Sequence, residues 1–410
     1  MGREHTIVEW KRCRVCEATD LTLFLELPNI PLVDDLLHAE EFGNEFVGPL
    51  RLYLCNGCGL VQTLRDINIA SYYRDYRYSV ASSPFALHFM QQLADLVWDT
   101  YGFQAGDCVI EVGSSDGMQL AGFHRKGAQV LGFEPSLALA QSARRRGIEV
   151  VQELFDVSSV EKISADKLPT QVLVLTHTLD HLPDPNGFLE AAKRALDPAR
   201  GVLVIEVHDL EKTVARRESC LFAHEHTTYY CAASLQRVLL RAGFHVINTA
   251  LVPDAERRIN SLLVVATLST SIYASQKMSA LAWNGLDRAD YMLAFGRSVH
   301  SSLTGLREFV QGESQRGVRL AGYGVGARGI MTLAAIARPG DFAYVCDKNP
   351  NVNGYFTPGT HIPVFTPEHL LTDPVDKVIV FSFGYFQEIY EELDEFRQRG
   401  GSLISLLDLL

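Results

Sequence analysis

Apolar runs alternate with amphipathic stretches through the middle of the chain, and this alternation predicts an α/β fold. Runs typical of buried strands lie near residues 107–112, 130–134, 170–177 and 201–209. A helical pattern over 186–196 separates the last two. Strands that alternate with helices predict a doubly wound parallel sheet, and an antiparallel hairpin over 246–268 is expected to end it.

The same order returns near the end of the chain. A long amphipathic helix is predicted over roughly 286–313, and a strand, a glycine-rich turn and a helix follow within 318–336. A further strand is expected within 342–350. This order predicts a second Rossmann-like domain.

Two features divide the chain into three parts. Pro84 precedes an amphipathic helix predicted over 85–103, and the polar stretch at 269–280 has the composition of a linker. The sequence therefore predicts an N-terminal domain, a middle domain and a carboxyl-terminal domain, at residues 1–84, 85–268 and 269–410.

Composition narrows the class of protein. With 410 residues, 47% hydrophobic and 21% charged, the chain is expected to fold throughout. The formal net charge of -12 argues against general nucleic-acid binding and favours a small substrate. The start has no apolar signal core, and no apolar run approaches the roughly 18 residues that cross a bilayer, so a cytoplasmic protein without a membrane partner is expected.

Four of the eight cysteines form two Cys-x-x-Cys pairs in the first domain. Cys13 and Cys16 stand in CRVC, and Cys55 and Cys58 stand in CNGC, where Gly57 is expected to allow the bend. Four thiolates satisfy tetrahedral zinc and leave no open position, which predicts a structural ion. Unmetallated thiols would leave two matched pairs unexplained, and a redox site would need only one pair.

A tyrosine-rich stretch at residues 71–84, SYYRDYRYSVASSP, joins the first two domains. It lacks helical or strand periodicity and predicts an ordered loop, either packed against the core or acting as a lid over a cofactor. Tyr78 is its candidate cofactor contact and Tyr76 its candidate substrate contact.

The first strand of the middle domain runs into EVGSSDG, which predicts a nucleotide-binding loop. Glu111, Gly113 and Gly117 form the pattern E-x-G-x-x-x-G, which lets a ligand approach the backbone at the carboxyl end of a strand. Glu134 ends the second strand and can hold two ribose hydroxyls. This arrangement favours S-adenosylmethionine (SAM) over a dinucleotide. Further candidate cofactor contacts are Ser115, Pro135 and His177.

The carboxyl-terminal domain carries a second glycine turn. Gly324, Gly326 and Gly329 match G-x-G-x-x-G, and Asp347 follows about 20 residues later. Alone this would suggest NAD, but any nucleotide diphosphate benefits from the same helix N-terminus. Either one glycine loop binds a cofactor and the other a substrate, or one of them is structural.

The stretch FAHEHTTYYC at residues 222–231 offers a metal site, a proton-transfer site or neither. A histidine suits a general base near neutral pH, and a neighbouring carboxylate can fix its tautomer. A metal site is disfavoured because adjacent side chains diverge and the helical H-x-x-x-H spacing is absent.

Taken together, these motifs resemble those of the SAM-dependent sugar C-methyltransferases, which act on nucleotide-linked keto-sugars in deoxysugar and antibiotic biosynthesis. The resemblance covers nearly the whole chain and rests on CRVC, CNGC, YYRDYRYSVASSP, EVGSSDG, TLDHLPDP, HEHTTYY, AGYGVGARG, VCDKNP and PGTHIPV, in this order. It implies that the middle domain holds SAM and that the carboxyl-terminal domain helps to hold the nucleotide sugar.

The resemblance also implies roles for single residues. His226 is expected to be the base that forms an enolate, with Glu225 in support, and His181 to stabilise the enolate or bind the sugar. His224 is left between an orienting and a structural role. The remaining candidate substrate contacts are Tyr229, Tyr323, Gly324, Arg328, Asp347, Lys348 and His361.

The expected reaction is methylation of a carbon beside the ketone of a nucleotide-linked, dTDP-type 4-keto-6-deoxysugar. Two alternatives stay open: the same fold could methylate oxygen, nitrogen or a non-sugar acceptor, or the second glycine loop could serve a nucleotide-sugar binder or an NAD-linked oxidoreductase. The sequence does not fix the oligomeric state and is compatible with a monomer.

Several positions depart from the family's pattern. They are Ala223 for tyrosine, His177 for asparagine, Asn260 and Leu263 for glycine and arginine, and Phe383 and Gly384 for a tryptophan-asparagine pair. All lie in motifs expected to border the acceptor. Tyr229 or Tyr230 is a candidate replacement for the missing phenol at Ala223.

Overall fold

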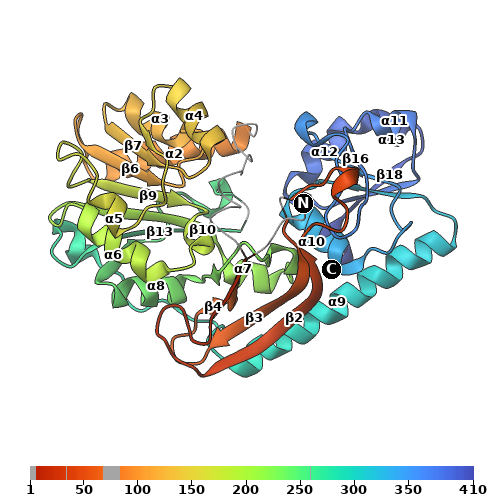
Figure 1. Ribbon diagram of the computed structural model, residues 1–410, viewed down its shortest axis with the longest axis horizontal. Helices are drawn as coiled ribbons and strands as arrows, with labels where there is room; N and C mark the ends of the chain where they lie inside the picture. Colours follow the sequence, from red (N-terminus) through yellow and green to blue (C-terminus); the bar gives the residue numbers. More distant parts are fainter. Residues whose placement is uncertain (1–5, 34, 68–83, 259) are drawn as a thin grey trace.

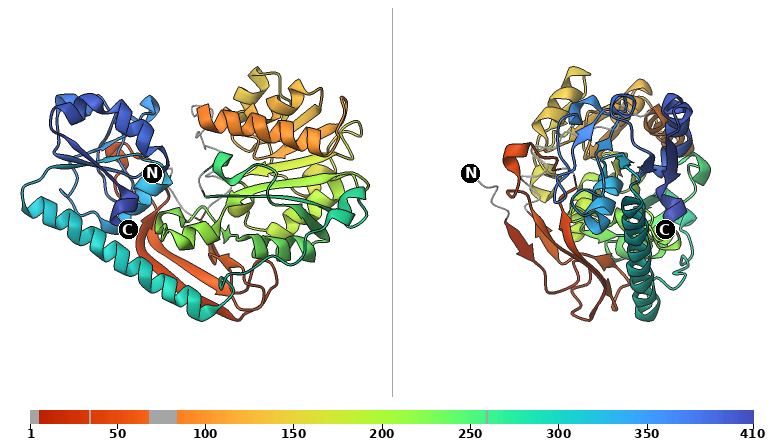
Figure 2. Two further views of the ribbon diagram at one scale, coloured as in Figure 1. Left: turned by 180° about the vertical axis from the view of Figure 1, so that it is seen from behind. Right: turned by 90° about the vertical axis from the view of Figure 1, so that its right-hand side faces the viewer.

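The computed structural model describes residues 6–33, 35–67, 84–258 and 260–410. Two α/β lobes lie side by side above a curved N-terminal sheet in the ribbon view (Figure 1). The middle lobe lies at the left of that view and the carboxyl lobe at the right. The N-terminal strands and one long helix run beneath them, which the view from behind also shows (Figure 2).

The middle lobe is a seven-stranded sheet with helices on both faces. Its strands are β6 Cys108–Val112, β7 Gln129–Phe133, β8 Val150–Val151, β9 Val172–Thr176, β10 Val202–His208, β12 Phe244–Asn248 and β13 Ser261–Leu268. Its helices are α2 Pro84–Thr100, α3 Met118–Arg125, α4 Leu137–Arg145, α5 Val157–Val160, α6 Pro185–Ala195, α7 Leu210–Ala215 and α8 Ala232–Arg241. The strand order is β12-β13-β10-β9-β6-β7-β8.

This order confirms the predicted doubly wound sheet. Strands β10, β9, β6, β7 and β8 run parallel, whereas β13 is antiparallel to both β10 and β12. All five positions of β6, Cys-Val-Ile-Glu-Val, are buried, as expected of a parallel strand covered on both faces. The buried carboxyl of Glu111 interrupts that apolar run at the end that carries the glycine loop.

The carboxyl lobe is a second parallel sheet. Its strands are β14 Leu320–Tyr323, β15 Val345–Cys346, β16 Val364–Phe365, β17 Lys377–Val380 and β18 Ser402–Ser405, in the order β16-β15-β14-β17-β18. Its helices are α9 Ala289–Gln315, α10 Ala327–Ile336, α11 His369–Thr372, α12 Phe386–Glu392 and α13 Asp394–Gln398. Although α9 has 27 residues, no helix in the described part of the chain is both long and apolar enough to cross a membrane.

The stretch predicted as a polar linker packs against the middle lobe instead. It forms the 3-10 turn η6, Ile272–Gln276, and the hydroxyl of Tyr273 donates to the carbonyl of Tyr101 at 2.5 Å. The amide of Met278 donates to Val246 in β12. These contacts fix the start of the carboxyl lobe on the middle lobe.

The N-terminal sheet has the order β11-β4-β3-β2, and one of its strands comes from the middle of the sequence. Strands β2 Leu21–Pro31, β3 Val47–Cys55 and β4 Val61–Gln62 belong to the first domain. Strand β11, Thr228–Tyr229, comes from residues 222–231, which we call the HEH stretch. A separate pair joins β1 Ile7–Glu9 to β5 Arg65–Ile67. The first domain therefore holds the HEH stretch by strand pairing.

Close packing between α9 and β2 joins the first domain to the carboxyl lobe. A Cβ added to Gly296 of α9 would lie 1.9 Å from the carbonyl oxygen of Phe24, so only glycine fits there. We expect Gly296→Ala to destabilise the protein by about 1–3 kcal/mol, the usual cost of overpacking.

The matched control for this prediction is Gly305→Ala in the same helix. Its added Cβ would meet nothing within 4 Å, and alanine should raise stability by about 1 kcal/mol. Urea unfolding of both variants checks the pair of predictions. Equal midpoints for the two variants would contradict the close approach at Gly296.

Candidate functional site

The four cysteines of the first domain form one compact cluster. Sγ of Cys13 lies 3.6 Å from Sγ of Cys58, and Sγ of Cys16 lies 3.4 Å from Sγ of Cys55. Ligands at about 2.3 Å from a tetrahedral zinc lie about 3.8 Å apart, so the donor set fits zinc. The bend after the second pair needs Gly59, whose φ is 75°, rather than the predicted Gly57.

Arg14, inside the first Cys-x-x-Cys, ties the cluster to the middle lobe. Its buried guanidinium forms an ion pair of 2.5 Å with Asp66 and donates to the carbonyls of Thr63 and Pro183 at 3.1 and 3.0 Å. Pro183 belongs to the TLDHLPDP loop. The zinc cluster therefore supports the loop that carries Asp180.

The loop after β6 is shaped to receive a ligand. Gly113 and Gly117 have φ of 73° and 80°, and a Cβ on Gly113 would lie 2.5 Å from Oγ1 of Thr178. Glycine alone combines this backbone with this close approach. Ser115, between the two glycines, also has a positive φ of 48°.

Buried polar atoms near this loop have no partner within the described part of the chain. They are Oε2 of Glu111, Oγ of Ser114 and both amide atoms of Gln119. Burial raises the pKa of Glu111 well above its usual range. Unpaired buried polar atoms are costly unless a ligand satisfies them, so these residues fit SAM.

Glu134 lies where a ribose-binding carboxylate is predicted. Its two oxygens accept hydrogen bonds at 2.9 and 2.8 Å from the amides of Ser115, in the loop after β6, and Ser136, which follows Pro135. A carboxylate has about four acceptor sites, so these two bonds leave capacity for ribose hydroxyls. Burial raises the pKa of Glu134.

The HEH residues point in different directions. His224 is buried and donates from Nε2 to the carbonyl of Ile30 at 3.1 Å, and Glu225 accepts from the amide of Val33 at 2.6 Å. Burial lowers the pKa of His224 to about 4. Both side chains therefore anchor the stretch to Ile30 in β2 and to Val33 just beyond it.

His226 faces the middle lobe. Its Nδ1 lies 3.1 Å from the carbonyl of Leu221. Because a carbonyl only accepts, the neutral ring carries its proton on Nδ1, and Nε2 is the basic nitrogen. The carbonyl of Leu221 thus fixes the tautomer of His226.

His226 belongs to a group that we call the histidine cluster: His177, His181, His208, His226 and the carboxylate of Asp180. The ring centroids of His181 and His226 lie 4.5 Å apart, those of His177 and His208 lie 4.5 Å apart, and those of His208 and His226 lie 5.1 Å apart. Oδ2 of Asp180 lies 2.9 Å from Nδ1 of His208. The cluster sits where β9 and β10 end.

Burial and mutual charge shape the titration of this cluster. Burial would raise the pKa of Asp180, but the hydrogen bond to His208 and the nearby His181 and His226 hold it well below its usual range. Burial, together with His226, lowers the pKa of His181 to about 3. Burial also lowers the pKa of His208. The cluster at neutral pH is therefore an ionised carboxylate among imidazoles, with His181 and His208 uncharged.

Glu206, on β10, lies beside His177 of the histidine cluster. It is fully buried, accepts from the hydroxyl of Ser261 at 2.7 Å and pairs with Arg258 at 3.2 Å. Oε1 of Glu206 also lies 3.6 Å from Nε2 of His177. Burial opposes ionisation of Glu206, but Arg258 and His177 lower its pKa to about 2.

Sequence reasoning missed Asp180, His208, Glu206 and Arg258 as site residues. The signal for His208 was available, because it ends β10 as His177 follows β9, and parallel strands end at one edge of the sheet. Asp180 could have been found from its place in the TLDHLPDP motif. Nothing in the sequence indicated Arg258.

On the carboxyl lobe, the second glycine loop resembles the first in its contacts. Asp347 accepts from the amides of Val325 and Asn349, each at 2.9 Å, as Glu134 does in the middle lobe. Gly324 has φ of 101°. The hydroxyl of Tyr323 is buried and has no partner within the described residues.

Arg328, at the start of α10, faces the middle lobe. Its guanidinium stacks on Phe383 at 4.9 Å and lies 3.8 Å from the buried carboxylate of Glu218. Its charge helps to lower the pKa of His208, after burial and His177. Arg328 therefore brings the carboxyl lobe to the edge of the histidine cluster.

Three predicted substrate residues have other partners. Lys348 is exposed and pairs with Glu388 and Glu392, and His361 pairs with Glu45 of the first domain at 2.5 Å. The hydroxyl of Tyr229 donates to the carbonyl of Ala223 at 3.0 Å and lies 3.1 Å from its amide. In this structure the polar groups of Lys348, His361 and Tyr229, which are predicted to contact the substrate, are thus engaged within the protein. The phenol of Tyr230 is likewise buried, against Thr228.

Two departures from the family's pattern have a structural explanation. Asn260 has φ of 59°, a left-handed backbone that asparagine tolerates and that favours the family's glycine. Phe383 retains an aromatic face, on which Arg328 stacks. Leu263 is fully buried in β13. Tyr76 and Tyr78 lie outside the described residues.

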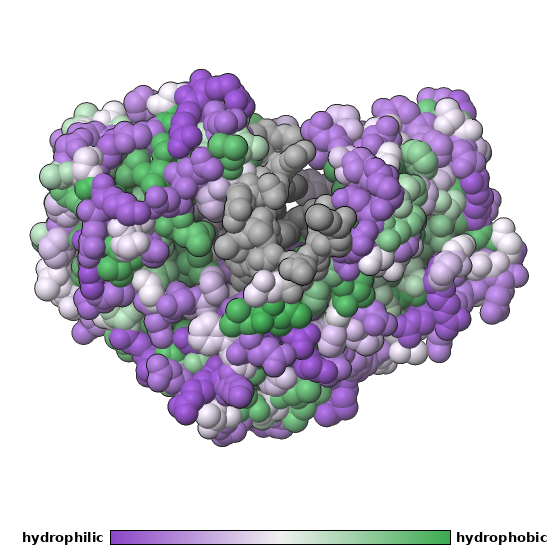
Figure 3. Space-filling view, in the orientation of Figure 1, coloured by the Kyte–Doolittle hydropathy of each residue, from purple (hydrophilic) through white to green (hydrophobic). Residues whose placement is uncertain are grey.

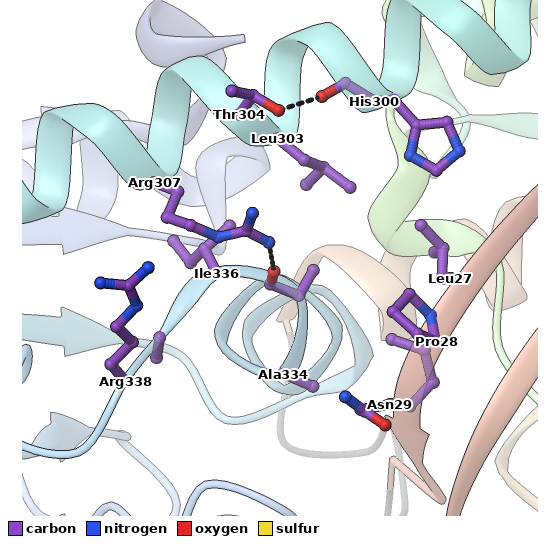
Figure 4. A pocket seen from close by; sticks show the side chains of 13 residues that line it. Leu27, Pro28, Asn29, His300, Leu303, Thr304, Arg307, Ala334, Ile336 and Arg338 are labelled. Atoms are coloured by element: carbon purple, nitrogen blue, oxygen red, sulfur yellow. Dashed lines mark hydrogen bonds between the residues drawn. The ribbon is translucent and has the colours of Figure 1, made fainter.

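A cavity of about 240 Å³ lies between β2, α9 and the end of α10 (Figure 4). Arg307 reaches over the end of α10 and donates to the carbonyl of Ala335 at 2.6 Å. This cavity is therefore bordered by the contact of Arg307 with the end of α10. It is separate from the histidine cluster, which lies at the ends of β9 and β10. In the space-filling view the outer surfaces of both lobes are mostly polar, and the outline is notched between them (Figure 3).

Comparisons with known proteins match three families along the chain, in order. Residues 13–73 match a family described as "Putative zinc binding domain", residues 85–249 a "Methyltransferase domain" and residues 269–407 a "C-methyltransferase C-terminal domain". The chain is 26% identical over 399 residues to the C-methyltransferase NovU of Streptomyces niveus, covering 96% of this chain and 94% of NovU.

Two further relatives match only part of the chain. A ubiquinone biosynthesis O-methyltransferase of Xanthomonas oryzae pv. oryzae is 33% identical over 96 residues, which is 23% of this chain and 40% of that protein. The crystal structure of 1,6-didemethyltoxoflavin-N1-methyltransferase of Burkholderia thailandensis matches with 19% identity and a TM-score of 0.35, covering 48% of this chain and 84% of that one.

Proposed function

Since the chain is a SAM-dependent methyltransferase with the zinc-binding, methyltransferase and carboxyl-terminal domains of a C-methyltransferase, we propose that it methylates a carbon beside a ketone. The proposed acceptor is a nucleotide-linked 4-keto-6-deoxysugar of the dTDP type. The methyl transfer proceeds through an enolate. The full-length similarity to the C-methyltransferase NovU supports carbon as the target atom.

The observation that carries this proposal is the placement of His226. Its Nδ1 is fixed by the carbonyl of Leu221, and its ring lies against His181 at the strand ends of the SAM lobe. A base and a neighbouring neutral hydrogen-bond donor are what enolate formation needs. With its pKa lowered to about 3, His181 can donate a hydrogen bond without carrying charge.

In the proposed reaction, Nε2 of His226 removes the proton from the carbon beside the ketone. The electrons of that C–H bond form a carbon–carbon double bond, and the carbonyl oxygen becomes the enolate oxygen. His181 donates a hydrogen bond to that oxygen. When the new C–C bond forms, the carbonyl is restored and His226 retains the proton until solvent removes it.

When bound, SAM supplies a methyl group on a positively charged sulfonium sulfur, and the rest of the cofactor is a neutral thioether leaving group. The residues proposed to hold it are Glu111 and the glycine loop through Gly117, with Glu134 toward the ribose. His177 follows β9 next to Thr178, which packs against Gly113. The glycine loop of the carboxyl lobe, with Gly324, is proposed to face the nucleotide of the acceptor.

Methylation of oxygen or nitrogen is the outcome that would count most directly against this proposal. Purified protein should be incubated with SAM carrying a carbon-13 methyl and with dTDP-linked 4-keto-6-deoxysugars. We expect a product heavier by one methyl, whose labelled carbon shows one-bond coupling to a ring carbon by NMR. A methyl bound to oxygen or nitrogen, or saturable NAD binding without SAM binding, would refute the proposal.

A further inference from the structure

Within the histidine cluster, two histidines and one aspartate lie where a single ion could contact all three. The candidate ligand atoms of His177, Asp180 and His208 all lie within 4.8 Å of one another. Oδ2 of Asp180 and Nδ1 of His208 lie 2.9 Å apart. Two ligands at right angles, each about 2.1 Å from an ion, lie about 3.0 Å apart, so this pair already has the spacing of neighbouring ligands.

Two atoms of this group lack the partners that burial demands. Oδ1 of Asp180 and Nδ1 of His177 are buried without a hydrogen-bond partner in the part of the chain that the structure describes. Asp180 is 2% exposed, and among the same residues its ion-pair partner is His208 rather than a lysine or arginine. A buried carboxylate that lacks a permanent cation is costly, and a bound ion would remove that cost.

The surroundings of His177 fit those of a metal ligand. Its Nε2 faces Oε1 of Glu206 at 3.6 Å, and Glu206 is itself held by Arg258 at 3.2 Å. Metal-bound histidines commonly turn their other ring nitrogen toward a carboxylate, which fixes the ring's orientation. This leaves Nδ1 of His177 as the nitrogen for the ion.

We propose that His177, Asp180 and His208 bind one divalent transition-metal ion, separate from the four-cysteine zinc site. Two imidazoles and a carboxylate suit such an ion and leave its other positions open to water or a substrate oxygen. Its use rests on the proposed function: a Lewis acid at this place polarises the ketone of the acceptor. Asp180, His181 and His226 form another candidate group. An ion bound there would occupy His226, the proposed base.

Cobalt binding to zinc-loaded full-length protein tests the site. We expect one Co²⁺ per chain beyond the zinc, with the visible bands of nitrogen and oxygen ligands and without sulfur-to-cobalt charge transfer. His177→Asn and His208→Gln should each weaken binding by at least about 10–100-fold, because losing a ligand costs no less than losing a group that only orients one. Asparagine tolerates the left-handed φ of 48° at His177, and glutamine can still bond Asp180, so both variants should fold.

The matched control is His300→Ala, which removes an exposed imidazole from α9 and should leave the affinity unchanged. No saturable cobalt binding, cobalt bound with thiolate charge transfer only, or wild-type affinity in both variants would overturn the site. Binding lost in His226→Gln but kept in His177→Asn would also overturn it. The titration needs no acceptor, so its failure is distinct from a failure of C-methylation.

Discussion

Replacing His226 with glutamine should lower the rate of C-methylation by about 10²–10⁴-fold, the range that loss of a general base costs. Glutamine can still hydrogen-bond to the carbonyl of Leu221, but it cannot remove a proton from carbon. SAM affinity should stay unchanged, because the proposed SAM contacts follow β6 and β7. The measurements are the turnover of the keto-sugar and the exchange of its acidic proton with deuterated solvent.

Solvent exchange separates a base from a residue that only shapes the site. If His226 is the base, exchange and methylation should fall together. Loss of methylation with exchange at the wild-type rate would contradict that role. The matched control is His245→Gln in β12, at the edge of the same sheet, which should change neither rate.

The sheets could be predicted because their signal is local. Mostly apolar runs such as Cys108–Val112 identified the buried strands, and the glycine motifs after them identified the turns in which Gly113 and Gly324 have a positive φ. These features depend on which residues the backbone tolerates at one place. The same reasoning placed Glu111 and Glu134 at neighbouring strand ends, as the structure does.

Long-range contacts were the part that the sequence could not supply. Strand β11 has two residues, and nothing local indicates that it pairs with β4. His361 was expected at the substrate, but its partner Glu45 lies more than 300 residues away in sequence. The four histidines of the cluster likewise come from three separate segments. Only the fold brings them within 4.5–5.1 Å, centroid to centroid.

Removing zinc should abolish methylation although no cysteine of the cluster is proposed to touch a substrate. Structural zinc contributes about 10–16 kcal/mol to folding in small zinc domains, and Cys16→Ser removes one of four thiolate ligands. The cluster holds Arg14 against Pro183, and the sheet beyond it pairs with β11 of the HEH stretch. Loss of the ion should therefore release two of the three segments that carry the histidine cluster, the loop with Asp180 and the HEH stretch.

We expect Cys16→Ser to lose its zinc, to unfold at a much lower temperature and to lose turnover before it loses SAM binding. Metal analysis, thermal unfolding and SAM calorimetry measure these effects. The matched control is Cys231→Ser, because Cys231 is the N-cap of α8, a position that serine favours, and zinc content should stay at one per chain. Wild-type stability and turnover in zinc-free Cys16→Ser would show that the first domain holds the histidine cluster without the ion.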